Sequence, residues 1–235
     1  MASIVLSPLA ATLDLTPAHL WLRSERPLSF LSSAPGGDGV AVGRHIISLY
    51  VDKTYRSDEP ERDLAALAER LGVAAHEGWV GLMTGVALDK AAVVVREHDG
   101  LAVAAVVTVG LGNASAAGRD PTGGWFESPP PAGTINTIVL VGAPLTAAGA
   151  VNAAMTATEA KALALADRGI RTRAGDLASG TSSDAIVIAA PLPTADGPQP
   201  LRYAGTATAL GWLIGRAVRE AITSRLPDRS PGTID

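Results

Sequence analysis

Residues 133–169 read "GTINTIVLVGAPLTAAGAVNAAMTATEAKALALADRG", and this stretch decides the fold class. Its first part is rich in Ile, Val and Thr and predicts a strand. From Leu145 onward, small and apolar residues predict a helix of about six turns. Thr146 can cap that helix at its start, and Gly169 can end it. A strand that runs directly into a long helix predicts a mixed fold.

The sequence on the C-terminal side of this stretch repeats the pattern. The polar loop "SGTSSD" at 179–184 leads into the strand "AIVIAA", and residues 203–226 predict a second long helix. Gly211 and Gly215 lie one turn apart on that helix, which predicts close backbone packing there.

The N-terminal half is dominated by strands. Short apolar runs punctuated by Pro and Gly predict antiparallel strands and turns, and a hairpin with a turn at 98–100 follows. Leucines 64, 67 and 71 predict one helix at 59–73. The whole pattern predicts an α+β fold: a single domain, 1–226, with a largely antiparallel sheet packed with two long helices, followed by a flexible C-terminal tail, 227–235.

Composition excludes several classes of function. Hydrophobic residues make up 47% of the 235 residues and charged residues 18%, as in a globular protein. Cysteine is absent, which excludes thiolate nucleophiles and Cys-ligated metal sites. The net charge is −4 and the basic residues are scattered, so no nucleic-acid partner is expected. No apolar run is long enough to span a bilayer as a helix, so no membrane partner and a cytoplasmic location are expected.

A polar stripe runs along the helix in 145–169. Asn152, Thr156 and Glu159 are spaced i, i+4 and i+7, so they share one face, with Lys161 on nearly the opposite side. Such a stripe is most often a solvated surface. The functional interpretation is that Glu159 enters a cleft as a general base, with Asn152 and Thr156 orienting it or the substrate. Lys161 is then either a surface residue or a substrate contact, and its position opposite Glu159 favours the surface.

The loop "SGTSSD" carries more hydrogen-bonding groups than a turn needs. Ser, Thr and Asp bond to their own backbone in turns, which is the structural explanation. The functional alternative is a nest of N–H and hydroxyl groups around an oxyanion, with Asp184 orienting the site. Asn136 lies within a strand where Asn is disfavoured, which predicts a specific partner. The four histidines show no metal-ligand spacing.

Four segments in order, "GTINTIVL", "VNAAMTATEAKALALADRGI", "SGTSSDAIVIA" and "YAGTATALGWLIGRAV", resemble the adenosylcobinamide amidohydrolase family. Upstream, "LSSAPGGDG", "GLMTG" and "GLGNASAAGRD" fit the same pattern, and the resemblance spans roughly residues 30–222. It implies a corrinoid substrate and hydrolysis of the amide between a corrin propionate and aminopropanol, in salvage for cobalamin biosynthesis. The products would be adenosylcobyric acid and 1-aminopropan-2-ol.

Amide hydrolysis needs a nucleophile, an oxyanion site and an acid for the leaving amine. Without cysteine the nucleophile is water, activated by Glu159, or alternatively a hydroxyl of Thr181 or Ser182. The expected catalytic residues are Glu159, Thr181 and Asp184. The expected substrate-binding residues are Ser182, Asn136, Asn152, Thr156, Asn113 and Thr134.

No cofactor and no added metal are expected, because cobalt would arrive only as part of the corrinoid. Trp125 and Phe126 in the Pro- and Gly-rich segment 118–133 would cover the corrin if that segment is a lid, or else pin the segment to its own domain. The alternatives are a non-catalytic corrinoid-binding protein, and an amidohydrolase or acyltransferase that acts on another bulky amide.

Overall fold

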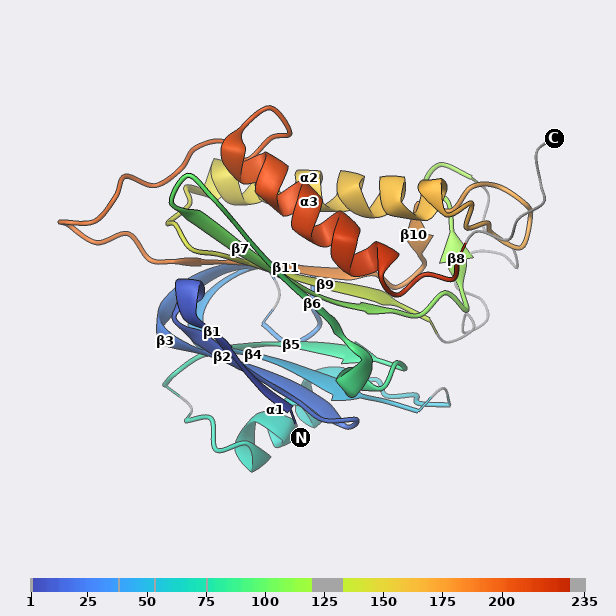
Figure 1. Cartoon of the computed structure of the whole chain (residues 1–235). Coiled ribbons are helices and arrows are strands. Elements are labelled where there is room, and N and C mark those ends of the chain that lie inside the picture. Colours follow the sequence, from blue (N-terminus) through green and yellow to red (C-terminus); the bar gives the residue numbers. More distant parts are fainter. Residues whose placement is uncertain (1, 38, 53, 75, 120–132, 229–235) are drawn as a thin grey trace.

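One sheet organises most of the chain (Figure 1). The computed structural model describes residues 2–37, 39–52, 54–74, 76–119 and 133–228. Along the main path the strand order is β1-β2-β3-β11-β9-β7-β6, and β4 pairs with β3 and β5. The strands in chain order are β1 (Ala2–Leu6), β2 (Ala11–Leu15), β3 (His19–Ser32), β4 (Gly39–Tyr50), β5 (Trp79–Thr84), β6 (Ala92–His98), β7 (Leu101–Val109), β9 (Ile135–Val141) and β11 (Ala185–Pro191).

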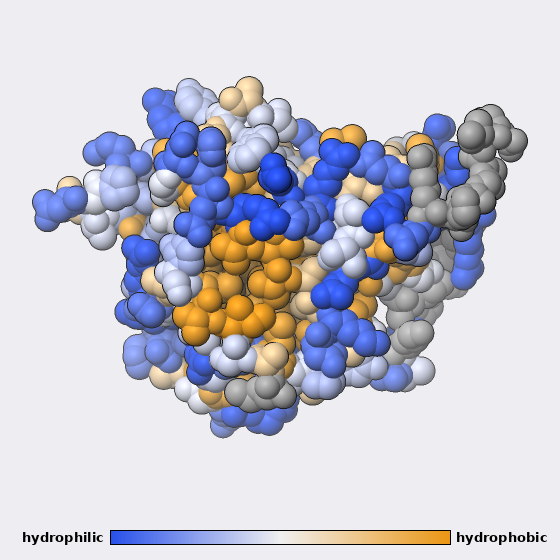
Figure 2. Space-filling model, viewed as in Figure 1, coloured by the Kyte–Doolittle hydropathy of each residue, from blue (hydrophilic) through white to orange (hydrophobic). Residues whose placement is uncertain are grey.

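Most strand pairs are antiparallel, as predicted. The parallel pairs are β4 with β5 and β9 with β11. The sheet curls until it is nearly closed, so that β5 and β9 approach one another without being neighbours: the Asn136 side-chain amide donates to the Met83 carbonyl at 2.7 Å. Figure 2 shows an apolar area below α3 (Ala209–Thr223), where Figure 1 places β1, β6 and β7. The edge strands of this sheet in the described chain are β1, β5 and β6, and the apolar area lies beside two of them, β1 and β6.

Both faces of the central strands are buried. Alternate residues of β7, β9 and β11 point into the curled sheet or toward the long helices, because successive strand side chains face opposite ways. Every residue of β9 is buried, which explains its largely apolar sequence.

The helices are α1 (Pro60–Arg70), α2 (Ala147–Asp167) and α3, and α2 and α3 lie together on one face of the sheet (Figure 1). The predicted ends of α2 are confirmed: Thr146 accepts from the Gly149 N–H, and Gly169 adopts a positive φ of 66° just past the helix. The mixed fold with two long helices is therefore confirmed. No helix in the described ranges is long and apolar enough to cross a membrane.

Two short strands and two 3-10 turns complete the described chain. They are β8 (Ala114–Ser115), β10 (Gly180–Thr181), η1 (Ser7–Leu9) and η2 (Leu88–Lys90), and β8 pairs with β10 in a separate ribbon. Of the predicted tail, Asp228 contacts Arg168 at 3.0 Å, while 229–235 lie outside the described residues. Trp125 and Phe126 also lie outside them, so the lid stays a prediction.

The two glycines of α3 differ in the space around them. A Cβ at Gly211 would lie 2.0 Å from the Gly205 carbonyl oxygen, whereas one at Gly215 would meet nothing closer than Thr156 at 3.9 Å. We expect Gly211→Ala to lower the free energy of unfolding by roughly 1–3 kcal/mol. Gly215→Ala should raise it by about 0.5–1 kcal/mol through helix propensity. Urea unfolding of both variants checks this, and equal effects would contradict it.

Candidate active site

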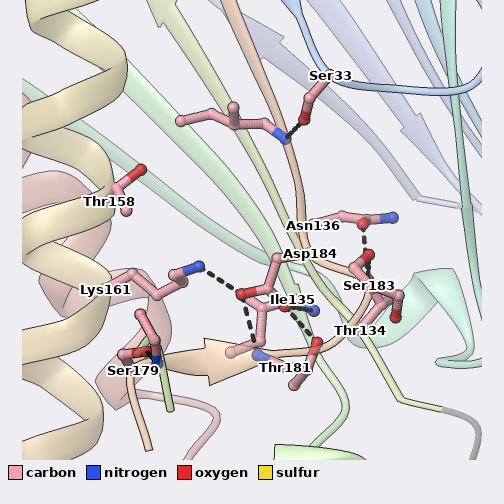
Figure 3. A network of polar contacts seen from close by, with 12 residues as sticks. Ser33, Thr134, Ile135, Asn136, Thr158, Lys161, Ser179, Thr181, Ser183 and Asp184 are labelled. Atoms are coloured by element: carbon pink, nitrogen blue, oxygen red, sulfur yellow. Dashed lines mark hydrogen bonds and ion pairs between the residues drawn. The ribbon is translucent and has the colours of Figure 1, made fainter. Parts of the chain in front are cut away.

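The loop "SGTSSD" folds around the carboxylate of its own aspartate (Figure 3). Asp184 Oδ1 accepts from the Ile135 N–H at 3.0 Å and from the Thr181 hydroxyl. Asp184 Oδ2 accepts from the Thr181 N–H at 3.1 Å and from the Lys161 ammonium. A carboxylate offers about four lone-pair sites, and here donors occupy all four. Each oxygen of the Asp184 carboxylate therefore already accepts two hydrogen bonds from the protein.

Lys161 reaches this carboxylate from α2. Its side chain is 13% exposed and that of Asp184 15%, so the pair is largely desolvated. The prediction that Lys161 is a surface residue is wrong. Lys161 does point away from Glu159, as helical geometry requires, but its side of the helix faces the sheet.

A small cavity opens beside the ion pair, between α2 and the starts of β9 and β11. Its volume is about 110 Å³. Its polar lining comprises Ser33, Thr137, Thr158, Lys161 and Asp184. The Ser33 hydroxyl accepts from the Ile186 N–H at 3.1 Å, which leaves its own hydrogen free to donate. This cavity, called the Lys161 pocket below, thus joins a cation with neutral hydroxyl groups.

A wider depression of about 410 Å³ lies at the C-terminal end of α3. Its lining includes Arg168 and Arg219, which pair with Asp228 and Asp167. These ion pairs involve exposed side chains, whereas the Lys161–Asp184 pair is largely buried, so the Lys161 pocket is the stronger candidate for chemistry.

The predicted oxyanion nest is not free for a ligand. The Thr181 N–H binds Asp184, and the Ser182 N–H lies 3.3 Å from the Asn113 carbonyl oxygen. The Ser182 hydroxyl accepts from the Asn113 amide at 2.8 Å, and the Ser183 hydroxyl donates to the Gly133 carbonyl at 2.6 Å. The loop therefore uses these groups to hold Asp184 and the neighbouring segments.

Asn136 lies in a strand and has a specific hydrogen-bond partner, as predicted. That partner is a backbone carbonyl of β5, so the contact holds the fold together. The Asn136 side chain is buried and donates to the Met83 carbonyl. Thr134 Oγ1 lies 3.1 Å from Asn136 Oδ1 and 2.7 Å from the Ser183 carbonyl oxygen. The two residues connect β9 to β5 and to the loop before β11, and neither lines the Lys161 pocket.

Glu159, Asn152 and Thr156, which were predicted to share a cleft with the loop 180–184, do not line the Lys161 pocket. Thr156 is buried and its hydroxyl donates to the Ala204 carbonyl at 2.8 Å, on the side of the segment before α3. Glu159 is exposed and makes no hydrogen bond or ion pair with any described residue. Asn152 is half-buried and does not line the pocket. The structure therefore gives no support to Glu159 as a base at Asp184.

The side of α2 next to the pocket carries exposed apolar residues. Val151 is 49% and Met155 55% exposed, and helical geometry places both on nearly the same face as the pocket residue Thr158. Two exposed apolar side chains therefore lie on the pocket side of α2.

Sequence reasoning preferred a surface position for Lys161 over a substrate contact, although one signal favoured a special role. The chain has three lysines, Lys53, Lys90 and Lys161, among 19 basic residues. Most basic residues of this chain are arginines, and the helix around Lys161 is rich in alanine. A single lysine in that helix is therefore unusual. It also lies two residues after Glu159, within the segment "VNAAMTATEAKALALADRGI" that carries part of the family resemblance.

His45 belongs to a second buried polar cluster. Its Nδ1 accepts from the Trp21 indole N–H at 3.2 Å, and its Nε2 lies 3.3 Å from a Glu77 oxygen. Burial lowers the pKa of His45 below 6.5, and Glu77 offsets this only in part. Within the described chain, no three acidic or histidine side chains gather where they could hold a metal ion.

This lowered pKa predicts how stability depends on pH. The unfolded chain binds the His45 proton more readily than the folded protein, so the free energy of unfolding should fall as the pH drops below about 6.5, down to the folded pKa. We expect His45→Gln to make the free energy of unfolding depend less steeply on pH. Part of the dependence should remain, because burial also lowers the pKa of His19. Urea unfolding between about pH 7.5 and 5 measures the slopes, and an unchanged slope in the variant contradicts the prediction.

Comparison with known proteins agrees with the sequence resemblance. A family model described as adenosylcobinamide amidohydrolase (CbiZ) matches residues 10–232. The adenosylcobinamide amidohydrolase of Methanosarcina mazei is 30% identical over 193 residues, which cover 80% of this chain and 85% of that protein. The protein of the same name from Halobacterium salinarum is 31% identical over 219 residues, 86% of each chain. A solved structure, the PH0078 protein of Pyrococcus horikoshii OT3, aligns over 89% of this chain and 77% of its own at 15% identity, with a TM-score of 0.45.

Proposed function

Because this chain belongs to the adenosylcobinamide amidohydrolase (CbiZ) family, we propose that it hydrolyses adenosylcobinamide in corrinoid salvage. The bond cleaved would be the amide between a corrin propionate and aminopropanol. Water would add its oxygen to the carbonyl carbon, the C–N bond would break, and the amine would leave with a proton. The products would be adenosylcobyric acid and 1-aminopropan-2-ol.

The observation that carries this proposal is the Lys161 pocket itself. It places a desolvated cation beside hydroxyl groups in a cavity of about 110 Å³. A cavity of this size holds a few water molecules or a small polar group. This suits one amide side chain of the corrin and is far too small for the ring. The ring would stay outside, against the apolar side of α2 at Val151 and Met155.

Water is the nucleophile that fits this geometry best. Cysteine is absent, and the Thr181 hydroxyl donates to Asp184 and does not line the pocket. Asp184 is assigned a positioning role, because each of its oxygens already accepts two hydrogen bonds from the protein. The cobalt of the corrin would enter with the substrate and lie away from the amide being cleaved.

The proposal is tested by incubating the purified protein with adenosylcobinamide and following adenosylcobyric acid and 1-aminopropan-2-ol by mass spectrometry. In H₂¹⁸O, hydrolysis should place one ¹⁸O in the new carboxylate. Binding without turnover would indicate the non-catalytic corrinoid-binding alternative. If the protein neither binds nor hydrolyses adenosylcobinamide, the proposed corrinoid substrate is overturned. The alternative of another bulky amide as substrate would then remain.

A further inference from the structure

Lys161 has unused hydrogen-bonding capacity inside the pocket. An ammonium has three donors, and Lys161 Nζ donates one of them to Asp184 Oδ2. No other described residue accepts from it, and the side chain lines the cavity while remaining only 13% exposed. Two N–H groups are therefore available to a ligand in a setting where water screens the charge poorly.

The surroundings hold this ammonium in one place. Asp184 is itself fixed by two backbone N–H groups, of Ile135 and Thr181, which belong to rigid parts of the sheet and loop. Gly180 leaves room for the pair, since a Cβ there would lie 2.3 Å from Asp184 Oδ2 and 2.9 Å from Lys161 Nζ. A charge that is held before the substrate arrives need not reorganise during the reaction.

A purely structural ion pair is the competing explanation. Such pairs contribute little net stability, because desolvation offsets most of the attraction between the charges. A structural pair also has no need to border a cavity. The Lys161–Asp184 pair forms part of the cavity wall, where a ligand can reach the remaining N–H groups.

We propose that Lys161 is a catalytic residue: its ammonium donates a hydrogen bond to the carbonyl oxygen of the scissile amide and stabilises the oxyanion formed when water adds. Asp184 is the positioning residue that holds Lys161. Lys161 keeps its protons throughout, and the amine's proton comes from the attacking water. This inference rests on the proposed function, because it assigns a role within that hydrolysis.

The first test replaces the cation. Lys161→Met should lower kcat on adenosylcobinamide by roughly 10²–10³-fold, the usual effect of losing one oxyanion donor, while KM changes little. Lys90→Met is the matched control, because Lys90 is exposed on η2 and outside the pocket, and it should leave the rate unchanged. Thermal unfolding of each variant shows whether it is folded.

The second test restores the cation chemically, which the absence of cysteine makes specific to one site. Lys161→Cys should lose activity as Lys161→Met does. Alkylation with 2-bromoethylamine creates an aminoethyl thioether of nearly the length of lysine and should recover kcat at least about tenfold, whereas alkylation with 1-iodopropane fills the same space without charge and should not. The thioether amine is a weaker base than that of lysine, so the alkaline limb of the kcat profile should move to lower pH.

The outcomes separate this inference from the proposed function. If the wild type turns over adenosylcobinamide and Lys161→Met retains its kcat, the role of Lys161 is overturned while the proposed function stands. The role of Lys161 would likewise be overturned if alkylation with the aminoethyl and propyl groups restored kcat equally. Filling the space of the side chain, without its charge, would then be enough for activity. If the wild type releases no product, the proposed function fails, and the role of Lys161 in it fails as well.

Discussion

Asp184→Asn should lower kcat on adenosylcobinamide by about 10²–10³-fold and destabilise the fold by roughly 2–4 kcal/mol. Every group that contacts the Asp184 carboxylate is a donor: two backbone N–H groups, the Thr181 hydroxyl and the Lys161 ammonium. The asparagine side chain would place its NH₂ group where one of the two carboxylate oxygens now lies. At either place the NH₂ group would face other donors. One backbone N–H would lose its acceptor, and Lys161 would lose the charge that holds it.

The matched control is Asp167→Asn, because Asp167 also pairs with a cation but lies at the surface. The side chains of Asp167 and its partner Arg219 are each about half exposed. An exposed pair contributes about 0–1 kcal/mol, so this variant should keep both stability and turnover. Steady-state kinetics and urea unfolding measure the two variants together. An Asp184→Asn enzyme with kcat within about threefold of wild type would show that the carboxylate does not position a catalytic group.

Gly180→Ala should lower kcat by about 10–100-fold, with a loss of roughly 1–3 kcal/mol in stability. Gly180 does not need glycine for its backbone angles, because its φ is not in the positive region. It needs glycine for space, since a Cβ would lie 2.3 Å from Asp184 Oδ2. The carboxylate cannot yield without losing its backbone N–H bonds, so the ion pair would be displaced, and small displacements of positioned groups are costly to catalysis.

Gly205→Ala serves as the control for this substitution. A Cβ at Gly205 would meet no atom within 4 Å, and its φ is also outside the positive region. We expect stability and kinetics close to wild type. If both alanine variants behave alike, the close contact at Gly180 has no functional consequence.

The elements of the fold could be predicted because their signals are local. Thr146 and Gly169 mark the ends of α2 by the hydrogen bonds and backbone angles that helix ends require. Asp99 and Gly100, both with positive φ, form the hairpin turn between β6 and β7 where the sequence places it. Neither signal depends on the rest of the chain.

Only part of the site could be predicted from such local signals. The clustering of Thr181 and Asp184 could be predicted, because side chains of short polar loops bind nearby backbone. The partners of Asp184 outside the loop could not, since Ile135 and Lys161 are distant in sequence and reach it only through the pairing of β9 with β11 and the packing of α2.

The sequence by itself determined the kinds of elements and their order, the ends of α2 and the family. Only the tertiary structure decided which side of α2 meets the sheet, and this reversed the expected places of Glu159 and Lys161. The physical reason is the composition of α2, where alanines and other small residues occur around the whole helix, so no single apolar stripe marks the buried face. Burial was then decided by the fit of the small side chains against β11 and α3, and the same fit brought Lys161 to Asp184.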